Sequence, residues 1–193
     1  MMQEIVLSGG RARLEPLRMA HAEALWQAAQ APEIWPFFFR PMASLEDIEA
    51  FIAEALEKQS RGEQLPFAVR DGESGKLVGS TRFMDFSATN RSAEIGATWL
   101  SPMVWRTRVN TECKFLLLRH GFEALGLVRI FFKADARNER SQRALERIGA
   151  QKEGVLRQHM ILPDGFVRDS VYYSILDREW PDVRARLEGF LAN

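Results

Sequence analysis

Cysteine is nearly absent from this sequence. The single cysteine, Cys113, excludes an intramolecular disulfide and leaves no cysteine cluster that could hold a metal ion. A lone cysteine within a helical stretch is typical of a small, half-buried apolar residue. The three histidines, His21, His120 and His159, form no ligand pattern either, so we expect no metal.

Long apolar runs and an excess of one charge are also lacking. No window approaches the ~20 apolar residues of a membrane span. The start M-M-Q-E-I-V-L-S-G-G lacks the charged region and long apolar stretch of a secretory signal. Lys+Arg and Asp+Glu each number 26, so the formal net charge is zero, which weighs against a general binder of nucleic acid or anionic membranes. We expect a soluble, cytoplasmic protein.

The sequence does contain enough apolar residues for one core. Of its 193 residues, 46% are hydrophobic and 27% are charged. That length and balance suit a single domain over residues 1–193, with a C-terminal helix from about residue 181. No repeat, low-complexity segment or long linker divides it. The oligomeric state is left open between a monomer and a homodimer.

Periodicity and turn residues predict the secondary structure of the first half. The expected elements are a strand at 11–16, a helix at 19–31, a helix from the Ser44–Asp47 capping box to Gly62, and strands at 66–70, 76–86 and 91–100. Three prolines keep the intervening segment 32–42, with its W-P-F-F-F-R-P, out of regular helix.

In the second half, helices separate the strands. The expected elements are a helix from about 110 to 126, a buried apolar strand at 128–134, a helix at 138–148 ended by Gly149, two strands around the turn 163–165, and a terminal helix with Val183, Leu187 and Phe190 inward. Hairpins followed by helix-separated strands indicate an α/β fold of the α+β type. We expect a mixed, mostly antiparallel sheet of about seven strands, flanked by helices.

The predicted strand S-A-E-I-G-A-T-W-L carries a carboxylate beside small residues. Strict alternation divides it into one face with Ala93, Ile95, Ala97 and Trp99 and another with Glu94, Gly96, Thr98 and Leu100. Glu94 is then either a solvated charge or a general base above a cleft. The pattern alone favours the solvated charge.

Two further motifs lie at predicted helix starts. In W-R-T-R-V-N, free backbone N–H groups and the helix dipole suit a pyrophosphate, and Arg106 and Arg108 would add charge-assisted contacts. In N-E-R-S-Q-R-A-L, Asn138 suits a helix N-cap, and Ser141 begins the buried stripe. Taken alone, a solvated basic turn and a structural serine are the favoured interpretations.

Together these motifs resemble the GNAT superfamily of acetyl-CoA-dependent N-acetyltransferases, in the branch that includes ribosomal-protein N-terminal acetyltransferases. The resemblance covers residues 11–180. It rests, in order, on A-E-I-G-A-T-W-L, W-R-T-R-V-N-T-E, N-E-R-S-Q-R-A-L-E-R-I-G-A-Q-K-E-G-V-L-R and D-G-F-V-R-D-S-V-Y-Y-S-I-L-D-R-E-W.

The resemblance implies a cleft between two splayed strands, where acetyl-CoA binds and a primary amine attacks its thioester in a ternary complex. The cofactor-binding residues that it implies are Trp99, Leu100, Trp105, Arg106, Thr107, Arg108, Val109, Asn110, Asn138 and Ser141. Glu94 is expected to accept the amine proton, and Ser141 to donate to the departing thiolate. The acceptor is expected to be a protein N-terminal α-amine or a small-molecule amine.

The chain departs from the family pattern in three places. The phosphate loop holds Met103, Arg106 and Arg108 where the family has Gln or Arg, then Gly, then Gly or Ala, and glycine permits positive φ. Leu145 stands where many members carry a tyrosine acid, which leaves the acid role to Ser141. Ala150 replaces an aromatic residue, a change in packing.

The acceptor pocket is the part that the motifs define least. We expect Trp35, Phe38 and His159 to contribute, although core rings and a structural histidine are the more common outcomes. The alternative function is a catalytically degenerate acyl-CoA-binding sensor or interaction module, favoured by the lost glycines and tyrosine. Nucleic-acid binding is disfavoured by the zero net charge and the lack of an aromatic–basic platform. The retained Glu94, Asn138 and Ser141 favour the enzyme.

Overall fold

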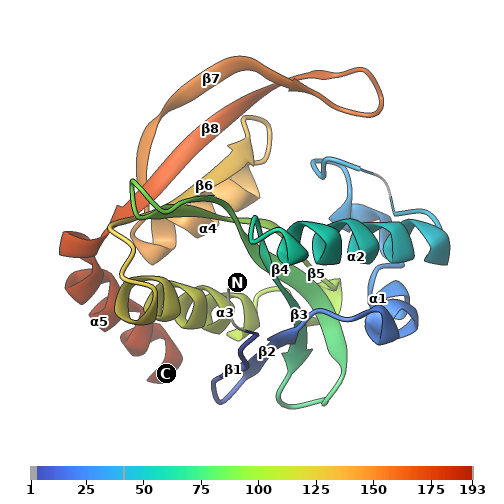
Figure 1. The fold of residues 1–193 in the computed structure, drawn as a ribbon, viewed down its shortest axis with the longest axis horizontal. Coiled ribbons are helices and arrows are strands. Elements are labelled where there is room, and N and C mark those ends of the chain that lie inside the picture. Colours follow the sequence, from blue (N-terminus) through green and yellow to red (C-terminus); the bar gives the residue numbers. More distant parts are fainter. Residues whose placement is uncertain (1–3, 41, 193) are drawn as a thin grey trace.

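The computed structural model describes residues 4–40 and 42–192, and it shows one open sheet with helices on both faces (Figure 1). The strands are β1 (Leu7–Ser8), β2 (Ala12–Pro16), β3 (Leu65–Asp71), β4 (Leu77–Ser87), β5 (Ser92–Leu100), β6 (Arg129–Asp135), β7 (Gln151–Ile161) and β8 (Val167–Leu176). Their order across the sheet is β1-β2-β3-β4-β5-β6-β8-β7. Within the described ranges, β5 and β6 form the one parallel pair.

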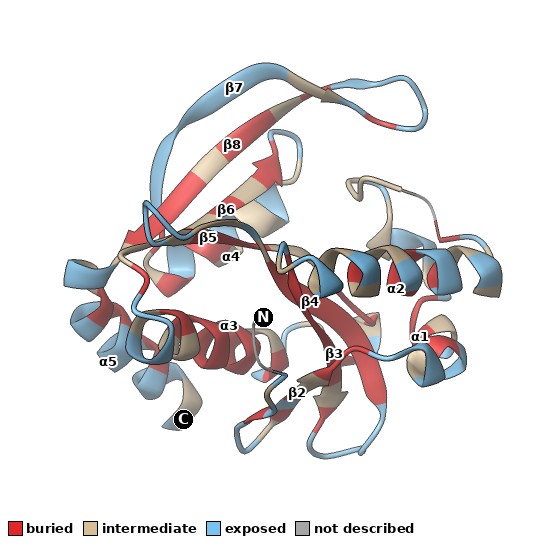
Figure 2. Cartoon of the chain, in the orientation of Figure 1, coloured by how far each residue is buried: buried red, intermediate tan, exposed pale blue. Residues whose placement is uncertain are grey.

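The helices cover the sheet unequally. They are α1 (Ala22–Ala28), α2 (Leu45–Ser60), α3 (Val109–Arg119), α4 (Glu139–Ile148) and α5 (Trp180–Ala192). Short helical turns are η1 (Met19–His21), η2 (Pro32–Ile34), η3 (Pro102–Val104), η4 (His120–Ala124) and η5 (Asp177–Glu179). Helices α1 and α2 pack on one side, here the α2 face, and α3, α4 and α5 pack on the other, the α3 face. Figure 2 shows α3 largely buried and β7 exposed along its length.

The predicted fold class, a mixed and mostly antiparallel sheet flanked by helices, is confirmed. The sheet has eight strands rather than about seven. The additional strand, β1, is two residues long and pairs Leu7 with Leu14 of β2. So short a segment carries no detectable alternation, which is why the sequence did not reveal it.

Local signals place the start of α2 and both ends of α4 correctly. The backbone N–H of Asp47 donates to the Ser44 hydroxyl at 3.2 Å, and the Ser44 N–H donates to the Asp47 carboxylate at 3.0 Å, which confirms the capping box of α2. Asn138 caps α4, since its Oδ1 accepts from the Ser141 N–H at 3.0 Å. Gly149 ends α4 with a φ of 100°.

Three expectations about individual elements are wrong. The helix expected at 19–31 is shorter, because it opens as the turn η1 and α1 ends at Ala28. The strand expected to be buried, β6, instead alternates, because Ile130, Phe132 and Ala134 pack in the core on the α3 face, whereas Arg129, Phe131 and Lys133 on the other face are only half-buried. Phe190 is 38% exposed rather than inward, and its ring packs on the guanidinium of Arg147 at the cavity edge.

The proline-punctuated segment before α2 adopts the turn η2 and then irregular turns, as predicted. Pro41, the third proline of that segment, lies outside the described residues. None of the helices within residues 4–40 and 42–192 is long and apolar enough to cross a membrane.

Candidate active site

The two parallel strands at the centre of the sheet separate part of the way along their length. Their pairing ends at Glu94, which lies opposite Phe131. Beyond that pair, β5 runs on to Leu100 and β6 to Asp135 without mutual pairing. The separation opens into a cavity of about 1780 Å³, which is lined from both faces of the sheet. A parallel strand pair that separates in this way can take an extended ligand between its two strands.

A β-bulge in β5 changes which side chains face each helix layer. Ser80 of β4 pairs with Trp99, and Arg82 pairs with Gly96, so Ala97 and Thr98 together stand opposite one residue. Ala97 has a φ of 47°. The bulge therefore overturns the predicted strict alternation. Trp99 belongs to the core on the α2 face, whereas Leu100 joins the core on the α3 face with Ala93 and Ile95.

Glu94 is a buried carboxyl group, so its interpretation as a solvated charge is wrong. Its residue is 5% exposed, lies on the α2 face and lines the cavity. Its Oε2 lies 2.7 Å from Nζ of Lys133 on β6, which also donates to Asp85 at 2.8 Å. Burial raises the pKa of Glu94 to about 7, although the Lys133 ammonium opposes that shift. A carboxyl group with such a pKa can accept a proton near neutral pH.

On the α3 face, the predicted phosphate loop lies at the N-terminus of α3. Trp105, Arg106, Thr107, Arg108 and Asn110 line the cavity there. Arg106 has a φ of 60°, the left-handed conformation that glycine usually supplies at this point of the family pattern. The loop thus keeps that geometry without the glycine. Arg108 adopts ordinary helical angles and donates to the Leu191 carbonyl at 3.1 Å.

Helix α4 adds further guanidinium groups along the same part of the cavity. Arg140, Arg143 and Arg147 follow one another at helical spacing and line it. Arg140 stacks over the Trp105 ring at 4.0 Å, and Arg147 donates to the Thr111 hydroxyl at 2.6 Å. Together with Arg106 and Arg108, these residues concentrate positive charge beside the α3 N-terminus in a chain that has no net charge.

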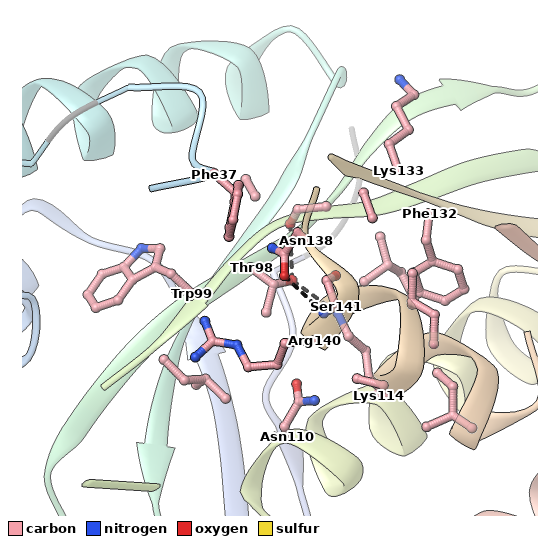
Figure 3. A pocket seen from close by; sticks show the side chains of 18 of the residues that line it. Phe37, Thr98, Trp99, Asn110, Lys114, Phe132, Lys133, Asn138, Arg140 and Ser141 are labelled. Atoms are coloured by element: carbon pink, nitrogen blue, oxygen red, sulfur yellow. Dashed lines mark hydrogen bonds between the residues drawn. The ribbon is translucent and has the colours of Figure 1, made fainter. Parts of the chain in front are cut away.

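Ser141 and Asn138 lie at the N-terminus of α4, between the Glu94 region and the arginine-rich region of the cavity. Both line the cavity, and Ser141 is half-buried in the first turn of α4 (Figure 3). Leu145, one turn further on, is buried at the cavity wall. The side-chain oxygen of Asn138 is used for the helix cap, which orients the first turn and hence Ser141.

Lys114 is a cavity residue that the sequence interpretation missed. It is 7% exposed, rises from α3 and donates to the Thr98 hydroxyl at 3.0 Å, near Ser141 in Figure 3. Its ammonium lies 5.7 Å from the Phe132 ring centroid. Burial lowers the pKa of Lys114 to about 8. The signal that could have found it is a lysine between Cys113 and the apolar run that starts at Phe115, within the helix segment C-K-F-L-L-L.

Lys133 was also missed, although it follows two phenylalanines in F-F-K-A-D. Its ammonium is 5.5 Å from the Phe131 ring and 5.6 Å from the Tyr172 ring. Burial by itself would lower the pKa of Lys133. The hydrogen bonds to Asp85 and Glu94 and the negative charges of these two residues outweigh it and raise the pKa of Lys133. Strand alternation alone would have placed it with Asp135 on one face of β6, and the register with β5 makes this the face that Glu94 occupies.

Of the three residues predicted to contact the acceptor, two line the cavity and one does not. Phe38 and His159 line the cavity, as do Phe37 and Phe39. Trp35 does not line it, because it packs on Trp99 with ring centroids 5.2 Å apart and donates to the Ala29 carbonyl at 3.0 Å. Nδ1 of His159 lies 3.0 Å from the Ser170 hydroxyl, which holds the ring at the cavity wall.

One residue that was predicted to contact the cofactor, Val109, does not line the cavity. Val109 is fully buried in the core, whereas its neighbours Arg108 and Asn110 do line the cavity. The first residue of α3 faces the sheet, and its side chain therefore has a packing role. Among the residues that the structure describes, no group of three or more His, Cys, Asp or Glu side chains is arranged to hold a metal ion.

Comparison with known proteins identifies the class. The family model described as acetyltransferase (GNAT) domain matches residues 11–151. The uncharacterized N-acetyltransferase YoaA of Bacillus subtilis is 31% identical over 176 residues, 89% of this chain and 96% of YoaA. YdaF of the same organism, named as a candidate ribosomal N-acetyltransferase, is 36% identical over 106 residues, 55% of this chain and 57% of YdaF.

A solved structure agrees over almost the whole fold. The GCN5-related N-acetyltransferase from Brucella melitensis superimposes with a TM-score of 0.91 at 31% identity, over 98% of this chain and 86% of that one. The chain belongs to the GNAT family of acetyltransferases and is an acyltransferase.

Proposed function

We propose that this protein transfers the acetyl group of acetyl-CoA to a primary amine in a ternary complex. The observation that carries the proposal is the cavity through the strand separation. It has a cationic phosphate-type site at the α3 N-terminus on one side and the buried carboxyl group of Glu94 on the other. A donor and an acceptor can thus approach the same gap from opposite faces of the sheet.

The residues on the α3 face fit acetyl-CoA. Its phosphates match the backbone N–H groups at the α3 N-terminus and the guanidinium groups of Arg106, Arg108 and Arg140. The extended pantetheine arm matches the unpaired backbone of β5 beyond Glu94. Acetyl-CoA would supply the activated acetyl group, and Ser141 and Asn138 would lie beside its sulfur end.

Different side chains would carry out the two proton transfers of the reaction. On the α2 face, Glu94 would accept the proton that the acceptor amine loses, with Lys133 holding its carboxylate in place. On the α3 face, the Ser141 hydroxyl would donate to the sulfur as negative charge grows there, near the positive end of the α4 dipole. Besides the positive end of the α4 dipole, the Lys114 ammonium would add a second positive group beneath the gap between β5 and β6.

The acceptor is an amine of a protein N-terminus or of a small molecule. The likeness to YdaF supports the first class, and the aromatic wall of Phe37, Phe38 and Phe39 supports the second. The reaction is proposed to take place in the cytoplasm. Glu94 and Ser141 both line the cavity, which favours catalysis over a degenerate acyl-CoA sensor.

The test measures binding and turnover separately. Calorimetry should show that acetyl-CoA binds the purified protein, and release of the CoA thiol should depend on an added amine. Binding without thiol release from any amine in a broad panel would support the sensor. Failure to bind acetyl-CoA would overturn both functions.

A further inference from the structure

A buried arginine lies at the acceptor end of the cavity. Arg82 is on β4, is 2% exposed and lines the cavity with Phe38 and Phe39. Its guanidinium stacks on the Phe51 ring of α2, 4.3 Å from the ring centroid. One terminal nitrogen, Nη1, donates to Oε1 of Gln64 at 2.9 Å. The group is therefore held rigidly from two sides.

The remaining edge of this guanidinium has no partner. Nε and Nη2 of Arg82 are buried without a hydrogen bond among the described residues. Those two nitrogens form the parallel pair of donors that a carboxylate accepts in a bidentate manner. Leaving buried charged donors unpaired costs free energy, so a site that keeps them is a candidate for ligand binding.

Among the residues that the structure describes, no carboxylate neutralises Arg82 directly. No ion pair of Arg82 is found within the described ranges, and the nearest acidic influence on it comes from Glu54. Glu54 itself pairs with Arg40 at 3.2 Å and with Lys58 at 2.7 Å. Burial lowers the pKa of Arg82 to about 10, which leaves it charged at neutral pH. This end of the cavity is thus cationic.

The sheet register relates Arg82 to Glu94. Glu94 pairs with Met84 and Arg82 pairs with Gly96, so the two charged residues are diagonal neighbours, about 7–8 Å apart at Cα, on the α2 face. Gly96, which has no side chain, leaves room on that face for the Glu94 carboxyl group and the Met84 side chain. A Cβ at Gly96 would lie 2.6 Å from Oε1 of Glu94 and 2.8 Å from the sulfur of Met84.

From this arrangement we infer that the acceptor is a primary amine that also carries a carboxylate, which Arg82 binds while the amine faces Glu94. The inference rests on the proposed acetyl transfer and specifies its substrate class. Two sources share this chemistry: a free amino acid, and a peptide whose first residue has an acidic side chain. The wall formed by Phe37, Phe38 and Phe39 would contact the rest of the acceptor.

The first experiment uses the unaltered protein with matched pairs of acceptors. One arm compares amino acids with their amides, and a second compares tetrapeptides beginning with Asp or Glu with those beginning with Asn or Gln. We expect the carboxylate-bearing member to have a kcat/KM about 10- to 100-fold higher in one arm, and that arm identifies the source. Equal use of acid and amide in both arms would overturn the inference.

The second experiment replaces the guanidinium. Arg82→Met keeps an apolar group against Phe51 and removes the unpaired donors, and it should abolish the preference for the carboxylate by raising KM for that acceptor alone. Arg82→Lys keeps the charge without the paired donors and should retain only part of the preference. Arg61→Gln, at the exposed end of α2, is the matched control. A preference that survives Arg82→Met would contradict the assignment.

Binding measurements separate this inference from the proposed function. Calorimetry of the unaltered protein with acetyl-CoA present tests each acid and amide without requiring turnover. Selective binding of the acids without CoA release would support the Arg82 site and contradict acetyl transfer. Turnover of amines with no selectivity for a carboxylate, in binding or rate, would support acetyl transfer and overturn the Arg82 site.

Discussion

The carboxylate of Glu94 lies 2.7 Å from the ammonium of Lys133, beside the last residue pair that joins β5 to β6. The two residues come from different strands, and their ion pair marks the point where the sheet opens. Burial nevertheless raises the pKa of Glu94 to about 7. The pair therefore combines a fixed position with a carboxyl group that titrates near neutral pH.

A pH-dependent loss of rate is expected for Glu94→Gln. Glu94 accepts a proton only when ionised, so kcat/KM of the unaltered protein should fall as pH decreases below about 7. The substitution should lower the rate about 100-fold or more above pH 7, where Glu94 is ionised while the acceptor amine is still largely protonated, and should lower it less at pH 6. Steady-state rates between pH 6 and 9 provide the measurement. The exposed Glu49→Gln is the control, and an unchanged pH–rate profile would refute the role.

The proposed binding of the CoA phosphates by Arg106 and Arg108 is tested by comparing a ligand that has the nucleotide with one that lacks it. Replacing Arg106 and Arg108 together with Ala should weaken CoA binding about 10- to 100-fold, because charge-assisted contacts to phosphate are lost. A pantetheine fragment without the nucleotide should be affected far less. Calorimetry with both ligands distinguishes the cases, with Arg178→Ala as the control. Equal losses for the two ligands would exclude the role.

The backbone at Arg106 makes a separate stability prediction. With a φ of 60°, this residue should tolerate glycine better than alanine. We expect Arg106→Gly to be more stable than Arg106→Ala by about 1 kcal/mol, measured by urea unfolding. Equal stabilities would show that the left-handed conformation is not maintained in solution.

Ser141→Ala tests the donor to the thiolate. The hydroxyl lies in the first turn of α4 at the cavity wall, and loss of one such donor should lower turnover about 100-fold or somewhat less. Acetyl-CoA affinity should stay within a few-fold. The measurements are single-turnover rates and calorimetry, with the exposed Ser60→Ala as the control. Normal turnover, or a loss of affinity alone, would make Ser141 a positioning residue.

Lys114→Met should stabilise the protein at neutral pH. Burial lowers the pKa of Lys114 from 10.5 to about 8, so the unfolded chain binds more protons between these values and stability rises with pH across that window. Replacing Lys114 should raise the free energy of unfolding by about 3 kcal/mol at pH 7 and by little above pH 10.5. Urea unfolding at pH 7 and pH 10.5 measures the difference. A variant equally stabilised at both values would contradict the assigned pKa.

Local motifs were predictable because neighbouring residues in the chain decide them. The N-cap of Asn138, the left-handed Gly149 and the capping box of Ser44 each depend on contacts within one helical turn. For the same reason, the approximate positions of the longer helices and strands followed from periodicity. The place of Ser141 in the first turn of α4 was predictable because it depends only on the helix that Asn138 starts.

The sequence by itself therefore determined the order of the longer elements, the capped ends of α2 and α4, and the residues of the α3 and α4 N-termini. Only the tertiary structure decided which side chains meet across the gap. The bulge at Ala97 depends on pairing with β4, and it moved Thr98 to the face of Lys114. Glu94 gained its raised pKa from burial between strands. Such burial and pairing arise between segments distant in the chain, and no local pattern encodes them.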